Sequence, residues 1–568
     1  MAEKKEPGQA RRWTAARREA ASRQLHENGT VDGSGVAFSG EDVQWMIASA
    51  PRMKGHPHFM NAHFENATFG LPERGSRGPS RVDFSFAVFD GAVTSFEHAK
   101  FLGDADFDGC DFLSEVELGA EFRGDCSFNS ADFRGGVTSF QGATFHGQSS
   151  FLGSTFHGMA SFASTTFLDF ASFQSTQFKE SVQFALPGKE PAVFKSMAFF
   201  LSATFAEGAV LTAIADRVEL SEAVLARPHE VALVAGEVIA SHLTMPQGGV
   251  IAVRFATVYL DDVRLEAPTT LVALEPSTTW RYVDRDQAAL LDHAFLENSR
   301  IRHPDRPLAH DQRGELDPRP RLASLVGSDV ANLTCTNVAM GSCDLRSVTG
   351  LDRLRLEGAT GFLPTPRLAW PRRLTRRQTL LDEHRLRGWP PASGEPAGSP
   401  LHGQELRTEA RRVAGLYQSL RKAREDRRDE PGAADFYYGE MEMRRRALPW
   451  WSVERWILTG YWLVSGYGLR AWRAVCGFCL AVGVGTVLFH LWGFTQTIKK
   501  SSPVYAPPPH DWGSAFQASI ESTTSVLRSL SVNWELTMLG ELTQLALRIL
   551  GPALLALAAL AIRARVKR

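Results

Sequence analysis

Two groups of side chains have types and spacing that could support chemistry. His56, His58 and His63 could ligate a metal ion, and Cys476 and Cys479 have the C-x-x-C spacing of thiol redox motifs. No acidic or cysteine ligand accompanies the histidines, and both cysteines stand inside an apolar stretch. We therefore expect a capping loop at the histidines and apolar packing at the cysteines, with no metal site.

A third group consists of two opposite charges near the C-terminus. Arg548 interrupts a long apolar run, and Glu521 lies in the polar segment that precedes it. A charged side chain inside a bilayer is costly unless it is paired or reaches the membrane surface. Two hypotheses stay open: Arg548 pairs with Glu521, or it extends toward the outer surface.

The composition limits the class of protein. The chain has 568 residues, enough for roughly three or four domains. Six cysteines in this length exclude a disulfide scaffold, and the N-terminus lacks the apolar run of a signal peptide. We find no phosphate-binding loop, nucleophile elbow or paired-acid motif. We therefore expect no enzymatic activity and no cofactor.

Phenylalanine is strongly enriched in one region. The chain has 36 phenylalanines against 8 tyrosines, and 27 of the phenylalanines lie between Phe59 and Phe205. From Phe96 to Phe184 most of their spacings alternate between five and six residues, a period that neither a helix nor a simple strand produces. The rings expected to fill a core are Phe96, Phe101, Phe107, Phe112, Phe128, Phe133, Phe145, Phe151, Phe156, Phe162, Phe167, Phe173 and Phe178.

A small residue usually stands two positions before each ring, as Ala99 does before Phe101. A small residue, a spacer and a large ring repeating about every five residues suit a four-sided β-solenoid with parallel coils. This pattern resembles the pentapeptide-repeat family and implies a mainly β fold, a right-handed quadrilateral β-helix. The six-residue units predict local bulges. Twenty-residue spacing, as in Val218, Val238 and Val258, predicts that the solenoid continues with aliphatic filling.

The C-terminal third predicts helices and a membrane. Residues 373–388 and 404–447 have helical spacing and many charges, which predicts a charged helical hairpin. Ala474–Phe494 and Leu542–Ile562 are long enough to span a bilayer, and a Trp-rich interfacial helix is expected before the first span. Seven Lys or Arg residues flank the two spans, and three lie in the loop that connects them. The positive-inside rule then places both termini and the solenoid in the cytoplasm of a two-span plasma-membrane protein.

The loop sequence ASIESTTSV at 518–526 resembles the pore helix of two-span potassium channels. The residues that carry this resemblance are Ser519, Glu521, Thr524, Ser525 and Val526. The resemblance implies a span, a re-entrant helix and a span in a homo-oligomer, with a tetramer as the family's arrangement.

The resemblance to potassium channels stops after Val526. Leu527 and Arg528 stand where the glycine-containing filter would follow, so potassium selectivity is not predicted. Gly551 lies close to the position of the hinge glycine in such channels.

These observations predict five segments. They are a basic N-terminal tail and cap (1–50), a Phe-rich solenoid (51–210), its aliphatic continuation with an insertion loop (211–365), a charged helical region with a linker (366–450) and a membrane module (451–568). The whole is most similar to the pentapeptide-repeat membrane proteins of actinobacteria.

Three functions stay open at this stage. The first is a channel-like two-span module coupled to a cytoplasmic interaction solenoid. The second is a non-conducting membrane-tethered scaffold, because residues 59–205 carry 17 acidic and 9 basic side chains that suit a basic partner. The third, suggested by the family, is a DNA mimic that regulates a topoisomerase. We expect a lipid bilayer, further copies of the chain and an unidentified cytoplasmic protein as partners, and no nucleic acid.

Overall fold

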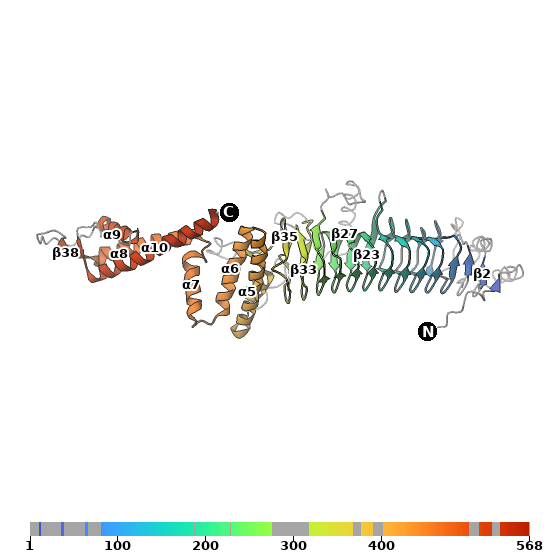
Figure 1. Ribbon diagram of the computed structural model, residues 1–568, viewed down its shortest axis with the longest axis horizontal. Helices are drawn as coiled ribbons and strands as arrows, with labels where there is room; N and C mark the ends of the chain where they lie inside the picture. The colour runs from blue at the N-terminus through green and yellow to red at the C-terminus, as the bar shows by residue number, and fades with distance from the viewer. Residues whose placement is uncertain are drawn as a thin grey trace. The chain divides into compact units, whose positions relative to one another are not determined.

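Figure 1 shows the computed structural model, which contains a long β-solenoid and a set of helices. It describes residues 11–12, 36–38, 63–65, 81–186, 189–227, 229–274, 317–366, 377–389, 401–498, 511–524 and 534–566. The chain divides into two compact units, residues 1–363 with 391–395 and residues 364–390 with 396–568. Most of the predicted N-terminal tail and of the predicted insertion loop, and the linker at 390–400, lie outside the described residues.

The first unit is a β-solenoid of about 10 turns, which confirms the predicted fold class. Its strands pair in parallel with the coils before and after them, and they form two sheets. One sheet has the 12 strands β1 (Arg11–Arg12), β2 (Val36–Phe38), β3 (His63–Glu65), β5 (Val88–Asp90), β9 (Asp111–Phe112), β13 (Asp132–Phe133), β17 (Thr155–Phe156), β21 (Gln177–Phe178), β24 (Thr204–Phe205), β26 (Val224–Leu225), β28 (Thr244–Met245) and β31 (Arg264–Leu265).

The other sheet has 23 strands and forms the remaining faces. They are β4 (Arg81–Asp83), β6 (Val93–Ser95), β7 (Lys100–Phe101), β8 (Asp104–Asp106), β10 (Glu115–Glu117), β11 (Glu121–Phe122), β12 (Cys126–Ser127), β14 (Val137–Ser139), β15 (Thr144–Phe145), β16 (Ser149–Ser150), β18 (Met159–Ser161), β19 (Thr166–Phe167), β20 (Ala171–Ser172), β22 (Val182–Gln183), β23 (Ala192–Phe199), β25 (Ala209–Glu219), β27 (His229–Ile239), β29 (Gly249–Arg254), β30 (Thr257–Tyr259), β32 (Thr269–Ala273), β33 (Arg321–Ser324), β34 (Leu333–Thr336) and β35 (Arg355–Glu357). The strand β36 (Leu363–Pro364) follows them.

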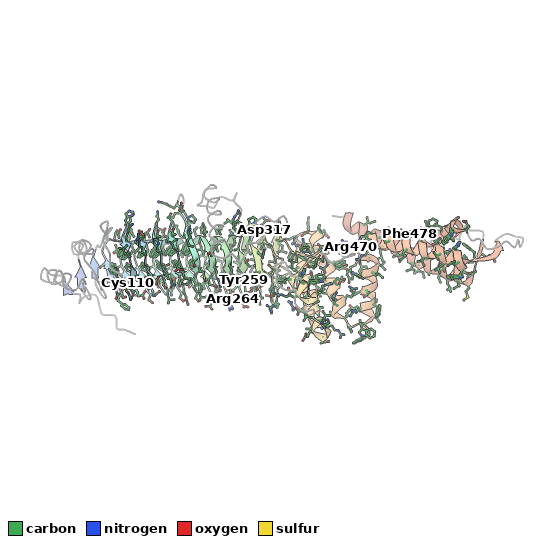
Figure 2. All side chains as sticks on the ribbon, turned by 180° about the vertical axis from the view of Figure 1, so that it is seen from behind. Cys110, Tyr259, Arg264, Asp317, Arg470 and Phe478 are labelled. Carbon is green, nitrogen blue, oxygen red and sulfur yellow. The ribbon has the colours of Figure 1, made fainter. Side chains whose placement is uncertain are left out.

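The solenoid core consists of columns of stacked rings. In the column Phe89, Phe112, Phe133, Phe156, Phe178 and Phe205, neighbouring centroids are 4.5 to 5.1 Å apart. This distance is close to the strand spacing, because each ring stacks on its counterpart in the next coil. Of the predicted rings, Phe101 is partly exposed and the others are at most 1 % exposed. The buried thiol of Cys110 lies among these coils (Figure 2).

The alternating ring spacing corresponds to two kinds of interval. The five-residue intervals contain a two-residue turn whose second residue has a positive φ, such as His98, Gly109, Ser130 or Ser164. The six-residue intervals between rings lack such a residue. The bulge expected in six-residue units is found in the interval that follows Phe194, whose ring stacks on Phe167. Among the described solenoid strands, register shifts occur at Phe194/Met197 and Val258/Tyr259.

The aliphatic coils continue the same ladders. Val218 pairs with Val238, and Val238 pairs with Val258, as their spacing predicted. Ile251 similarly connects Val231 to Leu271. Buried Val, Leu and Ile side chains thus replace the stacked rings while the strand pairing is unchanged.

The second unit is mainly helical. Its elements are β37 (Gln378–Thr379), α4 (Leu381–Arg387), α5 (Gly403–Asp426), α6 (Glu430–Ala447), α7 (Val453–Ser465), α8 (Ala471–Leu488), the π-helical turn η4 (Phe489–Gly493), β38 (Phe494–Ile498), α9 (Trp512–Thr524), β39 (Trp534–Leu536) and α10 (Met538–Val566). Helices α5 and α6 pack together as the predicted hairpin, with Val413, Leu416, Tyr417 and Leu420 buried. Asp429 caps the N-terminus of α6 by accepting from the Gly432 amide. Ala471–Gly493 and Met538–Ile562 are long and apolar enough to cross a membrane.

Candidate functional site

The candidate site is a short helix held between the two apolar helices. Helix α9 packs against α8, α10 and η4, and β38 pairs antiparallel with β39 beside them. The faces meet in a small core of Phe489, Phe494, Ala515, Ala518 and Leu547. Small residues on α9 therefore allow the two long helices to approach it closely.

A hydroxyl fixes the middle of α9 to the first apolar helix. Ser519 is fully buried, and its Oγ donates a hydrogen bond of 2.7 Å to the carbonyl of Val482 on α8. Gly485 makes this approach possible, because a Cβ at that position would lie 2.5 Å from Ser519 Oγ. The sequence analysis predicts Ser519 to be a pore-helix residue. The structure places it at the contact between α9 and α8.

The C-terminal end of α9 meets the second apolar helix at a glycine. A Cβ at Gly551 would collide with the carbonyl oxygen of Thr523, so the two backbones touch. Gly551 lies near the middle of the Met538–Ile562 span. At its other end, α9 begins with Trp512, whose ring stacks on His490 near the end of the first span. Helix α9 therefore extends from the end of one apolar helix to about the midpoint of the other.

The structure describes two of the other four pore-helix-like residues, Glu521 and Thr524. Thr524 Oγ1 donates to the carbonyl of Ile520 at 2.7 Å, and Glu521 accepts from Gln517 Nε2 at 3.1 Å. Ser525 and Val526 lie outside the described residues. Hydroxyls of Ser522 and Thr523 also donate back into their own helix, which satisfies carbonyls near its end.

Arg548 lies on the face of α10 that meets α9. It follows Leu547, which packs in the small core, and lies three residues before Gly551, so it is a neighbour of Gly551 on the helix surface. The side chain is partly buried. Its pairing with Glu521 stays a prediction.

A buried ionic cluster, which the sequence analysis missed, holds α4 against α5. Arg377 donates to both carboxylate oxygens of Glu383 at 2.6 and 2.7 Å, and the Tyr417 hydroxyl donates to Glu383 at 2.5 Å. Although burial alone would raise the pKa of Glu383, Arg377 and Arg387 lower it to about 2. Burial beside this carboxylate raises the pKa of Tyr417.

The same cluster reaches the helices that lead to the first span. Arg387 connects Glu383 to Glu442 of α6, with distances of 2.7 and 3.1 Å. Trp462 of α7 donates to the Tyr438 hydroxyl at 2.9 Å, and Arg473 of α8 donates to the Trp462 carbonyl at 2.9 Å. Partly exposed polar contacts therefore link α6 to α7, and α7 to the start of α8.

The remaining candidate sites gain no support as chemical centres. His56 and His58 lie outside the described residues, and His63 falls in the short strand β3. Cys476 and Cys479 are free thiols on α8. In the part of the chain that the structure describes, no cluster of three or more potential metal ligands occurs.

Comparison with known proteins supports the repeat. Residues 118–166 and 140–185 match the family model described as pentapeptide repeats (9 copies). The matched residues are the coils whose rings stack in columns. Neither the curated proteins nor the solved structures gave a match. Residues 118–185 of the β-solenoid therefore contain pentapeptide repeats.

Proposed function

We propose that this chain is a non-enzymatic integral membrane protein whose cytoplasmic solenoid is coupled to a channel-like two-span module. The single observation that carries the proposal is the position of α9. This short helix extends from the end of one apolar helix to the middle of the next. It suits a re-entrant segment, because irregular backbone at membrane depth must be enclosed by protein or line a water-filled cavity.

The exposed side chains of the two long helices support a membrane setting. Leu480, Ile549 and Leu560 are 58–68 % exposed on their surfaces. Lipid or further copies of the chain would cover such side chains. Because two spans cannot enclose a pore alone, the proposal requires a homo-oligomer, and we propose a tetramer. We assign no potassium selectivity, since Leu527 and Arg528 replace the glycine-containing filter.

Reconstitution of the full-length protein in planar bilayers tests conduction. We expect ionic currents from the wild type and from Gly483→Val, because a Cβ at Gly483 meets open space. Gly551→Val should abolish the currents, since its side chain would displace the end of α9. Silence of the wild type at all voltages, together with monomer-sized detergent particles, would contradict the proposal.

A non-conducting scaffold is the second candidate, and the charge of the solenoid favours it. Residues 81–134 contain 12 acidic and 4 basic side chains, whereas residues 135–205 contain 3 of each. A localised acidic surface suits a basic partner. Full-length protein should bind an oligolysine peptide in a salt-dependent way, and Glu97→Gln with Glu115→Gln and Glu117→Gln should weaken that binding. Equal binding by the triple variant would exclude this surface.

A further inference from the structure

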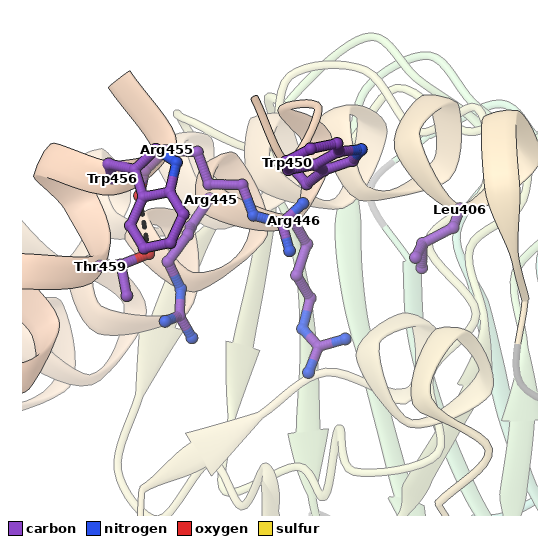
Figure 3. Close-up of a pocket in the computed structure, with 7 residues that line it drawn as sticks. All are labelled: Leu406, Arg445, Arg446, Trp450, Arg455, Trp456 and Thr459. Carbon is purple, nitrogen blue, oxygen red and sulfur yellow. Dashed lines mark hydrogen bonds between the residues drawn. The ribbon is translucent and has the colours of Figure 1, made fainter. Parts of the chain in front are cut away.

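A cavity of about 410 Å³ lies beside α7, outside the two-span site. It is lined by Leu406, Arg445, Arg446, Trp450, Arg455, Trp456 and Thr459. Figure 3 shows the Arg455 side chain reaching from Trp456 toward Trp450, while Arg445 and Arg446 extend away from the two tryptophans. The lining contains three guanidinium groups and no carboxylate, so its net charge is positive.

The three consecutive arginines at the end of α6 differ in how their charges are compensated. Arg444 pairs with Glu440 at 2.7 Å, and Arg445 pairs with Glu442 at 2.9 Å. Arg446 makes no ion pair or hydrogen bond with the described residues, and its Nε is buried without an acceptor. Burial and the nearby Arg387 lower the pKa of Arg446 to about 10, although Glu442 and Glu383 act in the opposite direction. A half-buried guanidinium whose Nε has no acceptor is stabilised by an anion that approaches it from the cavity.

Two further features of this cavity favour the binding of an anion. Arg455 Nη1 donates to the Leu448 carbonyl at 2.9 Å, which fixes the second guanidinium at the cavity. Arg446 and Leu406 also line a neighbouring cavity of about 370 Å³, together with Trp389 and His402. The Arg446 side chain is therefore next to open space in both cavities.

The exposed apolar side chains around the cavity favour a lipid anion over a soluble one. Trp450 and Trp456 at the cavity are 67 % and 65 % exposed, and Ile457 beside them is 64 % exposed. Exposed tryptophans next to arginines are typical of a membrane interface. Helix α7 also leads directly into α8, the first apolar span.

We propose that this cavity binds the phosphate of an anionic phospholipid, with Arg446 and Arg455 donating to the phosphate oxygens and Trp450 and Trp456 flanking the glycerol and acyl chains. Arginine suits this role because its planar donors match phosphate geometry. The inference depends on the membrane location of α7 and is independent of whether the module conducts ions.

Lipid titration of the purified full-length protein in a neutral detergent tests the proposal. Dioctanoyl phosphatidylglycerol is the probe, dioctanoyl phosphatidylcholine and glycerol 3-phosphate are the comparisons, and tryptophan fluorescence is the readout. We expect phosphatidylglycerol to bind at least about tenfold more tightly than either comparison. Arg446→Gln should weaken this binding about tenfold, the effect of one charge-assisted contact. The matched control Arg444→Gln removes the same charge from the same triplet and should change it less than about twofold.

Two results would overturn the proposal. Equal losses in Arg446→Gln and Arg444→Gln would mean general attraction to a basic surface and no site at Arg446. Equal affinity for glycerol 3-phosphate and phosphatidylglycerol would identify a soluble phosphate ligand. If Arg446→Gln fails to fold, Arg455→Gln provides the same comparison, with a loss expected and an unchanged affinity contradicting the site.

Discussion

The solenoid and the helical unit stabilise their cores in opposite ways. In the Phe-rich coils the axis is filled by rings and small apolar side chains, as at Phe133 between Phe112 and Phe156. In the helical unit the centre contains charges, with Glu383 fully buried between Arg377 and Arg387. In a periodic apolar core, a substitution affects mainly its own coil and the adjacent coils, because each coil contacts only its neighbours. A single ionic cluster depends on every member.

This difference has a consequence for coupling. Each ring contacts rings of its own coil and of the neighbouring coils. The polar contacts of the helical unit run from Glu383 through Arg387 to Glu442, which accepts from Tyr467 at 3.5 Å shortly before α8. We therefore expect changes in the ionic cluster to affect the two-span module more than changes in the solenoid do.

The largest expected effect comes from Glu383→Gln. It leaves the buried charges of Arg377 and Arg387 without their carboxylate and should lower the free energy of unfolding of the helical unit by about 5 kcal/mol. Tryptophan fluorescence during urea unfolding measures this, because ten of the 13 tryptophans lie between Trp370 and Trp534 and residues 81–274 contain none. Glu425→Gln is the control, since Glu425 is half exposed and pairs with Arg421 at 3.8 Å. Similar losses in both variants would contradict the role of the buried cluster.

Phe133→Ala should have a slightly smaller effect, confined to the solenoid. It removes a fully buried ring that stacks at 4.7 and 4.5 Å on its neighbours, at a cost of about 4 kcal/mol. The β-sheet circular dichroism signal should then disappear at lower urea while the tryptophan transition is unchanged. The exposed Phe86 provides the control substitution Phe86→Ala. A shift of the tryptophan transition in Phe133→Ala would mean that the two cores unfold together.

Acid should weaken the helical unit before the ring columns. The pKa of Glu383 is about 2 in the folded chain and 4.5 in its ordinary state. Its contribution, about 3 kcal/mol, is complete above pH 4.5 and is lost as the pH falls toward 2. Tryptophan-monitored unfolding from pH 7 to 2 should show this loss, and Glu383→Gln should lack this part of it. An identical acid profile in the variant would contradict the assignment.

Phe151→Tyr tests why the columns contain phenylalanine. The added hydroxyl would enter an axis where Phe151 is 0 % exposed and stacks on Phe128 and Phe173. An unsatisfied buried hydroxyl should cost about 2 kcal/mol in the circular dichroism transition. The exposed Phe86→Tyr should be neutral. Neutrality of Phe151→Tyr as well would show that the axis accommodates a hydroxyl.

The smallest effect is expected for Arg134→Ala. Arg134 pairs with Asp132 at 2.7 Å on the solenoid surface, but its side chain is 45 % exposed. Solvent screening limits such a pair to about 0.5 kcal/mol. A loss as large as that of Phe133→Ala would mean that surface charges carry solenoid stability.

The solenoid could be predicted because its side chains recur with a fixed period. The twenty-residue spacing of Val218, Val238 and Val258 corresponds directly to strand pairing. The ionic cluster has no period: Glu383 is 6 residues from Arg377 and 34 from Tyr417. Chain folding alone brings these side chains together. Likewise, the sequence does not show that Arg444 has an ion-pair partner while the Nε of Arg446 has no acceptor. Their neighbours in the structure show this difference.

The most direct test is the topology of the two spans. Ser501→Cys lies in the segment between them, and Leu152→Cys lies on the solenoid surface, 41 % exposed. The native thiols should give a low background to a membrane-impermeant maleimide, because burial raises the pKa of Cys110, Cys126 and Cys335 and Cys343 is buried. Cys476 and Cys479 lie in the first apolar helix, which the proposal places in the membrane.

Labelling of the full-length protein in intact cells gives the answer. The proposed two-span arrangement predicts that Ser501→Cys reacts in intact cells and that Leu152→Cys reacts after permeabilisation alone. Reaction of both cysteines from the same side, or release of the protein by alkaline carbonate, would contradict it.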